Sequence, residues 1–83
     1  MSNFSSQLDY GLAVKLREFG YRGFEMTYGI AFDWLASRGV VLWVETDGES
    51  WFYVCGGRYG DYERSWKDAA NAGLQKALSL LKK

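Results

Sequence analysis

Apolar residues recur at helical spacing near both ends of the chain, while strand-like patterns occupy its middle. The first stripe has steps of four, four and three residues and comprises Leu8, Leu12, Leu16 and Phe19. Ser5 or Ser6 can cap a helix there, and Gly20 stands where a helix often ends in the left-handed conformation. The pattern predicts a first helix that ends at about Phe19.

A second, shorter helix is expected after the connection formed by residues 20–26. Thr27 is a suitable N-cap, and Gly39 can end the helix. One face of this helix would carry Ile30, Ala31, Trp34 and Leu35. The third helix is expected after Ser65, which forms an S-x-x-D capping pattern with Asp68. Its stripe comprises Trp66, Ala70, Leu74, Ala77, Leu78 and Leu81.

Between the second and third helices, β-branched and aromatic residues indicate strands. Residues 40–46 (VVLWVET) and 50–55 (SWFYVC) flank Asp47-Gly48, a strong hairpin signal. A short third strand can follow near residues 59–63. The chain is therefore predicted to form one α+β domain over residues 1–83, with two N-terminal helices, a small antiparallel hairpin or three-stranded sheet, and a C-terminal amphipathic helix.

The hairpin pattern makes both faces of the sheet apolar. If Asp47 and Gly48 alone form the loop, Val44 pairs with Trp51, and every second residue shares their face. The better core face holds Val40, Leu42, Val44, Trp51, Tyr53 and Cys55. The opposite face receives Val41, Trp43, Phe52 and Val54. Such a cluster suggests a protein interface, although a helix or residues 20–26 could fold over it and bury it.

Composition excludes several kinds of site. The chain has no His and one Cys, so it cannot build a Ser-His-Asp triad, a Cys-His dyad or a disulfide within itself. Ten basic and ten acidic residues cancel, so no net field favours nucleic acid. Cys55 is expected to be a small buried residue, and no carboxylate pair indicates acid–base chemistry. We therefore expect neither an enzyme nor a cofactor or metal site.

The glycine-rich link after the hairpin (CGGRYG, residues 55–60) matches neither the P-loop nor the dinucleotide-binding fingerprint. Residues 58–64 mix arginines with tyrosines, as single-strand binders do, so a nucleic-acid or nucleotide binding module is the alternative hypothesis. Under the protein-binding hypothesis, Arg58 and Tyr59 would instead form a polar rim beside the apolar face.

Three segments, LAVKLREFGY (12–21), TYGIAFDWLASRGVVLWVE (27–45) and SWKDAANAGLQKALSLL (65–81), resemble short uncharacterised phage and prophage proteins. The matching positions are Leu16, Gly20, Ala31, Trp34, Leu35, Trp66, Ala69, Ala72, Gly73, Ala77 and Leu78. The resemblance implies no catalytic residue and no established activity. In those proteins the positions of Val41, Trp43 and Phe52 are usually polar, and Trp66 is usually a tyrosine.

This resemblance places the protein in a bacterial host cell, and the absence of a long apolar run predicts a cytoplasmic location without membrane contact. The expected function is binding to a host protein or complex, in which binding could inhibit a defence or regulatory system. The expected contact residues are Val41, Trp43, Phe52, Val54, Arg58 and Tyr59. A homodimer through the same face is the competing arrangement, and nucleic acid ranks below both.

Overall fold

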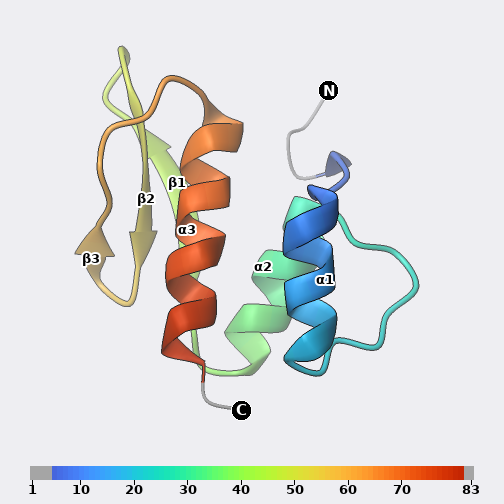
Figure 1. Cartoon of the computed structure of the whole chain (residues 1–83). Coiled ribbons are helices and arrows are strands. Elements are labelled where there is room, and N and C mark those ends of the chain that lie inside the picture. Colours follow the sequence, from blue (N-terminus) through green and yellow to red (C-terminus); the bar gives the residue numbers. More distant parts are fainter. Residues whose placement is uncertain (1–4, 82–83) are drawn as a thin grey trace.

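Three helices and three strands make up the computed structural model, which describes residues 5–81 (Figure 1). In chain order they are α1 (Tyr10–Glu18), α2 (Tyr28–Ser37), β1 (Leu42–Thr46), β2 (Trp51–Cys55), β3 (Arg58–Tyr59) and α3 (Trp66–Leu80). This confirms the predicted α+β class, the two N-terminal helices and the C-terminal helix. It also confirms the three-stranded form of the sheet.

The sheet is antiparallel, has the strand order β1-β2-β3, and is covered on one face by α3. Figure 1 shows α3 between the sheet and the other two helices, so that all helices lie on one side of the sheet. Gly73 lies where α3 meets the sheet, because a Cβ atom there would come within 2.6 Å of Leu42 and 2.8 Å of Tyr53. The missing side chain lets α3 approach the sheet closely.

The core lies between these layers and draws on every helix. Its largest fully buried side chains are Tyr28, Leu16, Leu35, Leu74 and Cys55. Trp66 joins α3 to α2, because its ring meets the rings of Tyr28 and Phe32 at centroid distances of 5.2 and 6.0 Å. The predicted apolar stripes therefore point inward. Their burial removes apolar area from water, which stabilises the fold.

The predicted start of the first helix is wrong. The helix begins at Tyr10 with Asp9 as its N-cap, and neither Ser5 nor Ser6 caps it. Backbone pairing holds the preceding residues extended: the N–H of Leu8 donates to the carbonyl of Met26, and the N–H of Tyr28 donates to that of Ser6. Because residues 6–8 are committed to this pairing, the helix cannot include them.

The caps predicted for the other two helices are confirmed. The Thr27 hydroxyl accepts a hydrogen bond from the N–H of Ile30 at 3.2 Å. The Ser65 hydroxyl accepts one from the N–H of Asp68 at 3.1 Å. Each bond satisfies an N–H group that has no partner within its helix, so the residues that start α2 and α3 are set locally.

A buried tyrosine links the three helices and makes the stability of the fold decrease as pH rises in the alkaline range. Tyr28 donates from its hydroxyl to Asn71 Oδ1 at 2.6 Å, and Asn71 Nδ2 donates to Asp9 Oδ2 at 3.1 Å. Burial, and then the negative charge of Asp9, raise the pKa of Tyr28 above its ordinary value. The folded protein therefore favours the neutral phenol more than the unfolded chain does.

We expect Tyr28→Phe to lower the free energy of unfolding by about 1 to 2 kcal/mol at pH 7, because Asn71 loses its donor. The stabilisation from Tyr28 is fully present below the unfolded pKa near 10 and is lost as pH rises through the higher folded pKa. Urea titrations between pH 8 and 11 should show a steeper loss of stability in the wild type than in Tyr28→Phe. Parallel pH curves for the two proteins would contradict this role.

Candidate functional site

The hairpin that carries the candidate site has a longer loop than predicted. Thr46 pairs with Trp51 and Val44 with Tyr53, so residues 47–50 form the loop and the predicted register is wrong by two residues. The Asp47 carboxylate accepts from the N–H groups of Ser50 at 2.8 Å and Glu49 at 2.9 Å. These bonds lower the pKa of Asp47 and stabilise the four-residue turn.

The register error leaves the assignment of faces intact, because a shift of two residues returns every side chain to its own side. Leu42 and Tyr53 face α3, as the contacts of Gly73 show. Trp43 pairs with Val54 on the other side, and Val41 continues the alternation, since its carbonyl accepts from the N–H of Gly56. The predicted division of the hairpin into two apolar faces is therefore correct.

We call the side of the sheet away from the helices the outer face. It comprises Val41, Trp43, Phe52, Val54, Tyr59 and Tyr62. Neither α3 nor residues 20–26 cover it, because all three helices lie on the other side and that segment lies beyond α1 (Figure 1). The outer face is thus an uncovered surface, and its own side chains decide how much of it is accessible.

Exposure differs sharply between the centre and the edge of this face. Val54, on the central strand, is only 3% exposed although it lies outside the main core, and Phe52 is half-buried. Val41 and Trp43, on the β1 side, are 53% and 41% exposed. Val54 therefore supports its neighbours, and exposed apolar side chains lie beside it on β1.

Two tyrosines flank the other side of the central strand. The ring of Phe52 meets Tyr59 at 5.6 Å and Tyr62 at 5.7 Å, both edge to face. Both tyrosines remain largely exposed. The sequence placed Tyr62 only in the segment that mixes arginines with tyrosines and did not assign it to this face, because Tyr62 follows the end of β3. The result is a small aromatic cluster that shields Phe52 and still presents its rings to solvent.

Arg58 does not belong to this face. It pairs with Cys55, whose side chain points toward the helices, whereas Tyr59 pairs with Val54 on the outer face. The segment that follows β3 also alternates charges, with Asp61 and Glu63 beside Arg64. The arginines of residues 58–64 therefore do not gather into a basic surface next to the tyrosines, and the arrangement does not favour phosphate binding.

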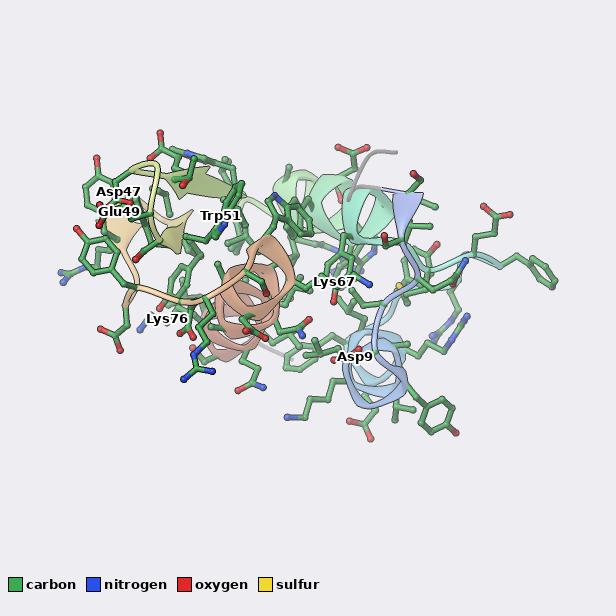
Figure 2. The ribbon with its side chains drawn as sticks, turned by 90° about the horizontal axis from the view of Figure 1, so that it is seen from above. Asp9, Asp47, Glu49, Trp51, Lys67 and Lys76 are labelled. Carbon is green, nitrogen blue, oxygen red and sulfur yellow. The ribbon has the colours of Figure 1, made fainter. Side chains whose placement is uncertain are left out.

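The edge of the molecule near the hairpin tip is acidic. Figure 2 shows Asp47 and Glu49 together at the tip, on the opposite side of the molecule from Asp9 at the start of α1. Glu45 lies on the same strand end as this tip. Carboxylates here would border any contact made by Trp43.

Residues 5–81 contain no group of three or more side chains that could hold a metal ion. Cys55 is buried, and burial raises the pKa of its thiol, which disfavours the reactive thiolate. No helix within residues 5–81 is long and apolar enough to cross a membrane.

Comparisons with protein families, with curated proteins and with solved structures found no match for this chain.

Proposed function

We propose that the chain is a non-enzymatic accessory protein that acts by binding another protein through the outer face of its sheet. The observation that carries the proposal is the exposure of Trp43 and Val41 beside the aromatic cluster of Phe52, Tyr59 and Tyr62. Buried contacts of tryptophan and tyrosine supply much of the binding energy in protein interfaces. On a sheet face that is exposed to solvent, these positions would normally be occupied by polar residues.

The rim of the face fits the same function. Carboxylates at the hairpin tip and the exposed hydroxyls of Tyr59 and Tyr62 surround the apolar centre with polar groups. A partner that presents an apolar surface bordered by basic side chains would complement it. The resemblance to phage and prophage proteins supports a host protein or complex as the partner, and inhibition of a defence or regulatory complex as the result.

We expect Trp43→Glu to reduce capture of the partner by at least about tenfold, because a hot-spot aromatic contributes about 2 kcal/mol or more and the added carboxylate must be desolvated. The measurement is affinity capture from bacterial lysate with quantitative mass spectrometry, followed by titration of the purified partner. Phe24→Glu is the matched control, since Phe24 is 97% exposed on the loop beyond α1.

The control variant should retain the same partner as the wild type. Circular dichroism should show that both variants are folded. Equal capture by Trp43→Glu and the wild type would then mean that the partner does not bind through the outer face. A partner lost from both variants would show that the contact extends to the loop that carries Phe24.

A further inference from the structure

The two edge strands of the sheet, β3 and β1, differ in how well they are protected against pairing with another chain. Within the described residues, β3 has two residues, carries Arg58 and is flanked by Gly57 and Gly60. Short length, charge and glycine are the features that keep an edge strand from pairing with another chain. The β1 edge has five residues in unbroken register, with no proline, glycine or bulge and one charged residue, Glu45. The β1 edge is therefore less protected against pairing than the β3 edge.

The backbone of β1 has hydrogen-bonding groups left over at this edge. In an antiparallel pair every second residue exchanges both bonds with its partner. Bonds from Gly56 N–H to the Val41 carbonyl and from Asp47 N–H to the Ser50 carbonyl fix that alternation. Trp43 and Glu45 therefore bond to β2. The N–H and C=O groups of Leu42, Val44 and Thr46 point outward, and no backbone bond from them to another element is formed within residues 5–81.

Exposed apolar area lies along the same edge. Val54 on the central strand is covered because it has a strand on each side, whereas Val41 and Trp43 have a neighbour on one side only. A further strand beside β1 would cover Trp43 in the way that Tyr59 helps to cover the central strand. A further strand beside β1 would thus satisfy its free backbone groups and cover its exposed side chains at the same time.

We infer that this occupant is the β1 strand of a second copy of the chain, which pairs antiparallel across a two-fold axis to give one six-stranded sheet. An axis through Val44 uses the outward groups of all three residues and places Glu45 of one copy opposite Trp43 of the other, so that carboxylates do not oppose each other. The axis is perpendicular to the sheet, so the helices of both copies stay on one side and the two outer faces join.

This inference deepens the proposed function, on which it rests for the use of Trp43, by naming one partner of the outer face as the chain itself. The joined faces would present a surface twice as wide to any further protein. Self-pairing through the edge also differs from face-to-face stacking, in which β3 would matter as much as β1.

The test is light scattering and sedimentation of the whole chain at rising concentration. We expect the wild type to reach twice its 9.5 kDa chain mass. Trp43→Glu should raise the dissociation constant at least about tenfold, because the new carboxylate would lie directly opposite Glu45 of the other copy. Tyr59→Glu is the matched control on the opposite edge strand, where Tyr59 is exposed, and it should leave the dissociation constant unchanged.

Amide hydrogen exchange on the wild type gives a second readout that needs no variant. The amides of Val44 and Thr46 should become protected as the dimer forms, whereas those of Trp43 and Glu45 should be protected in both states. A wild type that stays monomeric, a dimer that leaves Val44 and Thr46 unprotected, or equal loss of dimer in Tyr59→Glu would overturn the inference. A monomer would leave the capture experiment on Trp43→Glu fully informative, so the two proposals can fail separately.

Discussion

Gly73→Val should lower the free energy of unfolding by about 3 kcal/mol or more, a large part of the roughly 5 to 10 kcal/mol that holds a small domain together. The reason is the close contact of α3 with the sheet. A Cβ atom at residue 73 would lie 2.6 Å from Cδ1 of Leu42 and 2.8 Å from Cβ of Tyr53. The Leu42 methyl group can rotate away, but the Tyr53 Cβ is fixed by the backbone of the central strand.

Gly73→Ala separates this steric effect from helix propensity. Alanine favours a helix by about 1 kcal/mol relative to glycine, so a helix without a steric conflict would gain stability. At residue 73 we expect a net loss instead, because overpacking costs about 1 to 3 kcal/mol. Gly11→Ala in α1 is the matched control: nothing lies within 4 Å of its Cβ position, and we expect a small gain.

Urea denaturation of the three variants measures these effects directly. The expected order of stability is Gly11→Ala above wild type, then Gly73→Ala, then Gly73→Val. A stabilising Gly73→Ala would contradict the contact geometry, because it would mean that α3 and β2 can separate without loss.

The features that the sequence predicted correctly depend on neighbours in the chain. Thr27 and Ser65 cap their helices through bonds to residues three positions later, so their types and spacing suffice to identify them. Assignment of Trp43 to the outer face depends only on the alternation of a strand, and it survived an error of two residues in register.

The features that the sequence missed depend on distant parts of the chain or on one side chain. The first helix starts late because residues 6–8 pair with residues 26–28, across a separation that no local pattern reveals. The hairpin loop is longer than predicted because the Asp47 carboxylate accepts hydrogen bonds from two N–H groups. The Asp-Gly pair in the sequence does not predict these bonds. Burial of Val54 and the role of Tyr62 follow from the path of the chain after β3.

The residues of the candidate site were predicted only in part. Of the six residues expected to contact a partner, five share the outer face, and Arg58 lies on the side of the helices. Val54 supports the face from within, and Tyr62 adds an exposed ring. The alternation of side chains along the strands therefore identifies the residues of the outer face. Which of them are exposed depends on how the flanking strands and tyrosines cover its centre, and only the structure shows this.

Trp66→Ala should destabilise the fold by about 3 to 5 kcal/mol, because it removes the ring that joins α3 to α2 at the first turn of α3. Trp66 is 9% exposed and packs at 5.2 Å on Tyr28 and 6.0 Å on Phe32. Truncation would leave a cavity between two elements whose own propensities cannot hold them together. We expect Trp66→Ala to show a lower melting temperature and a largely unfolded population at 37 °C.

Trp66→Tyr is the informative counterpart, since it keeps an aromatic ring at the junction of α2 and α3. An aromatic ring of smaller volume can keep the edge-to-face contact with Tyr28, so the loss should stay below about 1.5 kcal/mol. Thermal unfolding followed by circular dichroism compares the two variants with the wild type. If Trp66→Tyr proved as damaging as Trp66→Ala, the indole would have a role that its packing does not explain, and the helix junction would depend on more than ring contact.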